Sequence, residues 1–225
     1  MSFYQHLADS TESQRKYLLA SPVIRDALAG QVSRDEYVAF LAQAYYHVRE
    51  TVPLLMACGA RLPERLEWLR KAVIDYLNEE YGHQEWVLAD LAEAGGDAGA
   101  VRHGTPAPAT AAMVSCAWDL IQRGNPVGFF GMVFVLEGTS VALATHAADR
   151  LRESLKLPRS AFTYLYSHGS LDEEHVDFLQ SLLNRLEDPE DQAAVVEAAR
   201  RFFLLYADMF RSLPRDSEDA GRDAA

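Results

Sequence analysis

The sequence predicts a single all-α domain in which the helices pack as a compact bundle. Apolar residues recur at the three- and four-residue spacing of an amphipathic helix through most of the chain. We find no run with the alternating pattern of a strand and no internal repeat. With 225 residues and 49% hydrophobic side chains, the chain can bury a sizeable core. These three observations place it among the all-α bundle folds.

The first half of the chain carries clear helix start and stop signals. Helices are predicted over residues 11–20, 22–29, 34–58 and 64–94. Ser33 and Glu36 form a capping box that begins the third of these helices. Pro53 lies within the same helix and should kink it, and Gly82 interrupts the fourth.

A loop rich in Gly, Ala and Pro is predicted over residues 95–108, and a second set of helices follows it. These helices are predicted over residues 109–123, 126–155, 160–186 and 190–213. The segment 126–155 is apolar almost all round, so it should lie at the centre. A distortion is expected near Gly169. The domain therefore spans residues 1–214, and residues 215–225 form an acidic tail that we expect to be disordered.

Composition excludes several classes of partner. The formal net charge is −12, whereas nucleic acids and anionic membranes attract patches of Lys and Arg. No uninterrupted apolar run reaches the length of a membrane span, and the N-terminus lacks the pattern of a signal peptide. Cys58 and Cys116 sit in apolar helical patterns and indicate neither a disulfide framework nor a zinc site. We expect a cytoplasmic protein with no nucleic-acid or membrane partner.

The stretch 167–175 holds the most specific chemical pattern. His168, Asp172 and His175 stand at positions i, i+4 and i+7 and share one helix face. Imidazole and carboxylate ligands suit iron, manganese and zinc, so the row is typical of half a metal site. The alternative is an ordinary surface helix with solvated polar residues.

Two further helices carry carboxylates and histidines that could complete such a site. Glu80 and His83 form a Glu-x-x-His pair, which helical bundles use to hold dinuclear iron or manganese, although an exposed acidic stripe would look the same. Glu137 lies in the most apolar helix, and a carboxylate there is rarely buried unless it is paired or binds metal. A buried Glu–Arg pair is the structural alternative.

The helix 34–58 offers a fourth polar face. Gln43, His47 and Glu50 lie on it with Tyr46 beside them, either as further ligands or as groups that hydrogen-bond to ligands. A bundle would bring these four faces together around about six ligands for two metal ions. The predicted metal ligands are Glu80, His83, Glu137, His168, Asp172 and His175, with Glu50 as a further ligand and His47 in reserve. The pocket is predicted to include Gln43, Tyr46, His47, Phe130 and Phe134.

These motifs resemble the haem-oxygenase-like superfamily, which includes thiaminases of the TenA type, pyrroloquinoline quinone synthase and the haem-oxygenase-like diiron oxidases. The resemblance covers roughly residues 10–213 and rests on the motifs at 44–47, 79–86, 136–138 and 168–175. It implies a bundle of seven to eight helices, commonly a homodimer, with one pocket. Among its branches the diiron oxidases match best, with Glu50 or Glu79 as substitutes for Glu80 as the first glutamate ligand. The segment 126–155 lacks the cysteine nucleophile of the thiaminase branch, and Tyr206 stands about where that branch has a glutamate.

The resemblance implies an oxidase or oxygenase that uses two iron ions, or manganese, and O₂ to oxidise a small organic substrate. The alternative within the superfamily is a metal-free TenA- or PqqC-like enzyme acting on a heteroaromatic molecule, with His83, His168 and Glu137 as acid–base groups. A third reading is a protein that binds a small molecule without catalysis.

Overall fold

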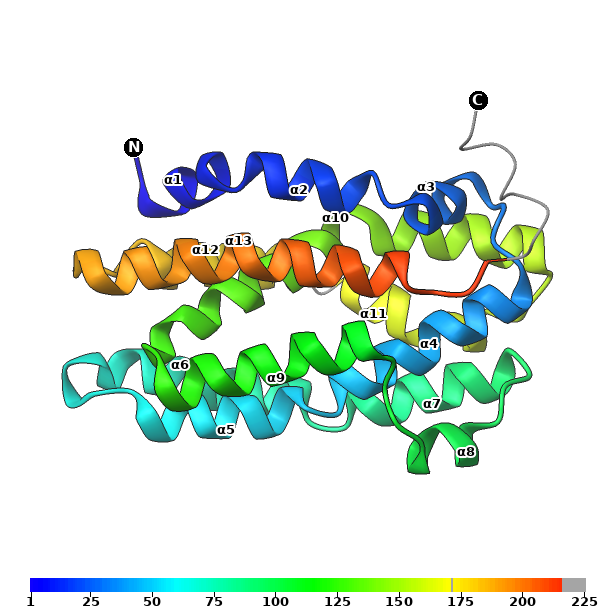
Figure 1. Ribbon diagram of the computed structural model, residues 1–225, viewed down its shortest axis with the longest axis horizontal. Helices are drawn as coiled ribbons and strands as arrows, with labels where there is room; N and C mark the ends of the chain where they lie inside the picture. The colour runs from blue at the N-terminus through cyan, green and yellow to red at the C-terminus, as the bar shows by residue number, and fades with distance from the viewer. Residues whose placement is uncertain (171, 216–225) are drawn as a thin grey trace.

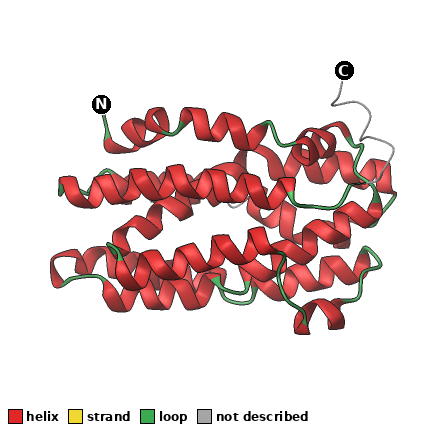
Figure 2. Ribbon diagram, in the orientation of Figure 1, coloured by secondary structure: helices red, strands yellow, loops and turns green. Residues whose placement is uncertain are grey.

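The chain folds into one all-α domain, as the sequence predicts. The computed structural model describes residues 1–170 and 172–215, and the side chains of residues 170–175 lie outside that description. Figure 2 shows helices joined by loops, with no strand in the described part of the chain.

Helical segments follow one another along the whole described chain. Those of the first half are α1 (Phe3–Ser10), α2 (Glu12–Leu19), α3 (Pro22–Ala29), α4 (Arg34–Val48), α5 (Thr51–Arg61), α6 (Glu67–Glu80), α7 (His83–Glu93) and α8 (Ala98–His103). Those of the second half are α9 (Pro108–Arg123), α10 (Phe129–Leu155), α11 (Thr163–Ser170), α12 (Asp172–Leu183) and α13 (Pro189–Arg211). Short 3₁₀ turns η1 (Glu64–Leu66), η2 (Pro126–Gly128) and η3 (Arg159–Phe162) precede α6, α10 and α11.

The described chain thus has more helical segments than the seven to eight expected, because several long helices are divided. The segment 34–58 breaks at Arg49 and Glu50, between α4 and α5. Pro53 explains the position of this break, since its ring would clash with the carbonyl of Arg49 four residues earlier in a continuous helix. The capping box of Ser33 and Glu36 is confirmed, with Ser33 N donating to Glu36 Oε2 at 2.7 Å.

The segment 64–94 is also divided, at Tyr81 and Gly82. Gly82 adopts φ = 97°, a left-handed conformation that ends one helix and starts the next. Two further expectations need correction. The predicted loop 95–108 contains α8, and Asp97 caps this helix by accepting a hydrogen bond from Ala100 N. Helix α1 also forms at the start of the chain, where no helix was predicted.

The helices form layers around α10 and α13 (Figure 1). In this view α13 runs through the middle, α1 to α3 lie above it, and α5 and α9 lie below it. Helix α10 packs most extensively against α11 and α13, and also against α3 and α12. Their apolar faces join in one core that includes Phe130, Phe162 and Phe202.

Helix α10 is the most apolar element, and its environment changes along its length. By length and composition the segment Pro126–Leu155 could cross a membrane, with a mean hydropathy of 1.8 in its most apolar window, but 56% of that window is buried within the bundle. A core helix meets the same criteria. Residues 129–135 are nearly all buried, whereas Ala142, Thr145 and His146 on the second half are exposed, so α10 is not enclosed on all sides.

Candidate metal centre

Three of the predicted ligands lie together. Glu80 ends α6, His83 begins α7 and His168 lies on α11, and their ligand atoms are all within 4.8 Å of one another. Nδ1 of His83 is 3.1 Å from Oε2 of Glu80, and the His83 and His168 ring centroids are 5.1 Å apart. The cluster is sheltered: His83 is 4% exposed, and the other two residues are half-buried.

The turn at Gly82 brings Glu80 and His83 together. The sequence predicted one helix face for this pair, but the two residues belong to different helices. Because the left-handed glycine redirects the chain immediately after α6, His83 still faces Glu80. Trp86, one turn along α7, stacks on one face of the His83 imidazole, with ring centroids 4.1 Å apart.

The orientation of His168 is set by its own helix. The carbonyl oxygen of Tyr164 lies 2.9 Å from Nδ1 of His168. Because a carbonyl can only accept a hydrogen bond, Nδ1 carries the proton and Nε2 carries the lone pair that can bind a metal. Tyr164 N in turn donates to Oδ2 of Asp90 at 2.7 Å, which ties the start of α11 to α7. Both histidine-bearing helices are therefore held to each other.

Glu80, Glu137 and His168 border the same cavity, which has a volume of about 70 Å³. Glu137 comes from α10, and residues of α4, α5, α6, α11 and α13 also border this cavity. Burial, followed by the neighbouring Glu137 carboxylate, raises the pKa of Tyr76 on α6 well above its ordinary value. Glu137 thus lies in a partly dehydrated environment next to a phenol, which limits its contact with bulk water.

His47 is the one member of the predicted pocket set that borders this cavity. It is 4% exposed, and its Nε2 has no hydrogen-bond partner among the described residues. Burial lowers the pKa of His47 to about 4, and the adjacent His168 acts in the same direction. At neutral pH this imidazole is uncharged and can accept a proton, a hydrogen bond or a metal ion.

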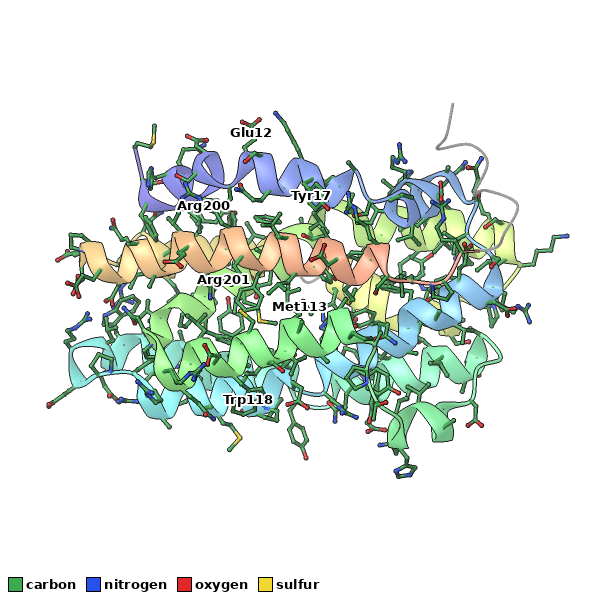
Figure 3. The ribbon with its side chains drawn as sticks, in the orientation of Figure 1. Glu12, Tyr17, Met113, Trp118, Arg200 and Arg201 are labelled. Carbon is green, nitrogen blue, oxygen red and sulfur yellow. The ribbon has the colours of Figure 1, made fainter. Side chains whose placement is uncertain are left out.

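The other residues predicted on α4 and nearby have structural contacts elsewhere. Glu50 accepts a hydrogen bond from Trp118 Nε1 at 3.2 Å, and Figure 3 labels Trp118 on α9. Gln43 accepts from Ala107 N and Thr110 Oγ1, fixing the start of α9 to α4. Arg49 stacks on Tyr46.

The two predicted phenylalanines belong to the core rather than to the cavity wall. Phe130 is fully buried, and Phe134 packs edge-on against Tyr4 and Phe203. The cavity is instead bordered by their neighbours Phe129 and Met132. Asp172 and His175 lie in the segment whose side chains are outside the described residues, so their place in the site stays a prediction.

Among the cavity residues outside the predicted site set are Tyr76, Ser140, Tyr164 and Tyr206. Tyr76 and Tyr164 each stand four residues before a predicted ligand and therefore on the same helix face. This spacing could have predicted that both tyrosines lie near the site. Tyr206 on α13 borders the cavity beside His47, with ring centroids 5.9 Å apart. Only the packing of α13 against α10 and α4 brings it there.

The donor set is one that fits iron. One carboxylate and two imidazoles on neighbouring positions form the combination that non-haem Fe(II) sites use, and a second carboxylate from Glu137 could extend it. A family model described as iron-containing redox enzyme matches residues 38–207. The chain belongs to this family of iron-containing redox enzymes. The matched segment contains every metal ligand that the sequence predicts.

Solved structures of proteins with several different descriptions share this fold. A Shewanella denitrificans domain of unknown function with a haem oxygenase-like fold aligns with a TM-score of 0.83 and 20% identity, covering 95% of this chain and 92% of that one. A TenA homologue from Pseudomonas syringae pv. tomato gives 0.79 and 11%, covering 94% and 91%. Haem oxygenase from Leptospira interrogans gives 0.75 and 17%, covering 95% and 100%. These likenesses establish the haem oxygenase-like fold alone. No curated protein matches this sequence.

Proposed function

We propose that this protein is a dinuclear non-haem iron oxidase or oxygenase that uses O₂ to oxidise a small organic substrate. The observation that carries the proposal is the convergence of Glu80, His83 and His168, together with the cavity that Glu80 and His168 share with Glu137. Membership of the iron-containing redox enzymes supports iron over other metals. The two-iron count depends on Asp172 and His175 joining the described cluster.

The residues of the site have separable roles in this proposal. Glu80, His83, Glu137 and His168 would hold iron, which when bound supplies the redox chemistry with O₂ that side chains lack. Tyr164 keeps the Nε2 lone pair of His168 available by accepting from Nδ1. Phe129, Met132 and Leu136 form an apolar wall that restricts water in the cavity.

Iron stoichiometry tests the proposal directly. We expect protein prepared without O₂ and supplied with Fe²⁺ to retain about two irons per chain, by analogy with dinuclear sites held by bundles. His168→Ala should lose at least half of that iron. His146→Ala is the matched control, because His146 is exposed on α10 and is not among the grouped ligands. Wild-type protein with less than half an equivalent of iron, and no change in His168→Ala, would contradict the proposal.

A second measurement separates this function from metal-free acid–base catalysis. The cavity contains His47, Tyr76 and Glu137, which could move protons without a metal. O₂ consumption with a panel of candidate substrates, before and after removal of iron by a chelator, distinguishes the two. Consumption that needs iron supports the oxidase; turnover that continues at full rate without iron or O₂ supports the metal-free enzyme.

A further inference from the structure

A second cavity adjoins the first, and His168 is the one predicted ligand among its lining residues. It has a volume of about 90 Å³ and lies between α3, α4, α10, α11 and α13. Ser140, Tyr164, His168 and Tyr206 border both cavities. A molecule in the second cavity would therefore reach the metal cluster at His168.

The lining of this second cavity is hydrocarbon. Its walls include Val23, Ile24 and Leu28 on α3, opposite Leu143 and Leu151 on α10. No Asp, Glu, Lys or Arg lines it among the described residues. A ligand with charged or strongly polar groups in this part would lose its hydrogen bonds to water without replacement.

Two of the few hydroxyl groups in the wall already donate hydrogen bonds to the backbone. Tyr37 donates to Ala161 O at 2.7 Å, and Thr139 donates to Val135 O at 2.6 Å. Because these donors are satisfied by backbone carbonyls, they offer little to an incoming polar group. Ser140 and Tyr206, which also carry hydroxyl groups, lie at the edge that this cavity shares with the metal site.

The wall is also elongated. On α10 it runs from Thr139 to Leu151 along one helix face, a rise of roughly 18 Å at 1.5 Å per residue. Ala144 and Ala147 on that face, and Ala27 on α3, leave a slot between the helices rather than a broad chamber. A flexible chain of methylene groups fits this shape better than a fused ring system does.

We propose that the substrate carries an unbranched hydrocarbon tail that occupies this cavity, which we call the tail cavity, with its polar head at the His168 edge. The head-group part rests on the proposed function, whereas the tail part rests on the lining alone. The chain's own C-terminal residues are unsuited to this place: residues 216–225 contain Asp, Glu, Ser, Arg, Gly and Ala and no larger aliphatic side chain. The position of Ala147 in the wall makes it a residue that determines substrate length.

Binding of straight-chain alcohols to iron-free protein tests the tail cavity independently of catalysis. We expect calorimetric titrations with hexanol, octanol and decanol to show Kd tightening by about fourfold for each methylene, the ratio that corresponds to ~0.8 kcal/mol per buried CH₂. Octanoate and octylamine form the second arm, which identifies the head group that the His168 edge accepts. Affinity that does not change with chain length would overturn the proposal.

Two filling variants and one matched control locate the binding. Ala147→Phe places a ring in the slot from α10, and Leu28→Trp fills it from α3 should the first variant fold poorly. Ala142→Phe is the control, because Ala142 is exposed on the same helix. At least tenfold weaker decanol binding in a folded filling variant, with wild-type affinity in the control, supports the proposal. Equal affinity in all variants that keep the wild-type circular dichroism spectrum overturns it.

Iron content of the same proteins separates this inference from the proposed function. Ala147→Phe should keep the wild-type iron content, since residue 147 is not among the ligands. If decanol binding follows the expected pattern but wild-type protein binds no iron, the tail cavity stands and the oxidase proposal fails. If iron binds as expected but decanol does not bind, only the tail cavity fails.

Discussion

Asp90 on α7 links the two histidine-bearing helices by hydrogen bonding to the start of α11. It is fully buried on α7, and its Oδ2 accepts from Tyr164 N at the start of α11. Tyr164 is also the residue whose carbonyl orients His168. A change at Asp90 therefore reaches the metal cluster through one intervening residue, although Asp90 does not border the cavity.

Asp90 should make the stability of the fold depend on pH. Burial raises its pKa to about 6, against hydrogen bonds from Tyr164 and Thr163 that lower it. Since the folded-state pKa lies above the unfolded one, the folded protein binds this proton more tightly. The resulting stabilisation is complete below about pH 4 and is lost as the pH rises through about 6, by on the order of 2–3 kcal/mol.

Asp90→Asn tests this expectation, because an amide keeps an oxygen acceptor for Tyr164 N and cannot ionise. Denaturant unfolding at several pH values should show the wild type losing stability relative to Asp90→Asn between pH 4 and pH 7. Asp90→Ala removes the acceptor as well and should be less stable than Asp90→Asn at neutral pH, by about 1–3 kcal/mol. If the difference in unfolding free energy between the wild type and Asp90→Asn does not change with pH, the titration assigned to Asp90 is wrong.

At the scale of elements, glycines set how closely α10 approaches its neighbours. A Cβ on Gly131 would contact Val195 O and lie 2.8 Å from Ala199 N, both on the backbone of α13. A Cβ on Gly169 would contact the Thr145 side chain and lie 2.9 Å from Thr145 N, where α11 meets α10. Backbone atoms cannot move aside locally, so these positions fix the distances between the helices.

Gly131→Ala and Gly138→Ala should change stability in opposite directions. The first forces α10 and α13 apart and should cost about 1–3 kcal/mol, as overpacking does. The second meets no described atom within 4 Å, so it should stabilise α10 by about 0.5–1 kcal/mol through helix propensity. Thermal unfolding of both variants, side by side, checks the pair. Destabilisation by both would show that α10 does not tolerate added volume at either position.

At the scale of the whole molecule, metal binding should act as a clamp on the bundle. The described ligands come from α6, α7 and α11, and Glu137 adds α10, so a bound ion would link the α6–α7 part of the chain to the distant α10–α11 part. Iron that binds the folded state and not the unfolded one raises the free energy of unfolding.

Anaerobic thermal unfolding with and without Fe²⁺ measures this clamp. At Fe²⁺ concentrations about 100-fold above Kd the gain is ~2.7 kcal/mol, which corresponds to a rise in Tm of roughly 5–10 °C for a chain of this size. His83→Ala should lose most of the rise, and His146→Ala should keep it. An equal rise in His83→Ala would place the stabilising ion elsewhere.

The sequence alone determined the helical class, the capping box at Ser33 and the residue types of the site. Helical periodicity and caps are local properties, so a short stretch of sequence is enough to reveal them. Pro53 and Gly82 were both expected to interrupt their helices, but the sequence does not specify whether such a residue kinks one helix or divides it into two, as it does before Pro53 and at Gly82.

Only the tertiary structure decided which polar faces meet. Glu50 and Glu80 were both reasonable ligands from spacing, yet Glu50 contacts Trp118 whereas Glu80 contacts His83. Helical spacing specifies the face on which a side chain lies, but the partner on that face comes from another helix, far away in sequence. The tail cavity is the extreme case: its walls come from five helices, and its apolar residues look like ordinary core until the helices are packed together.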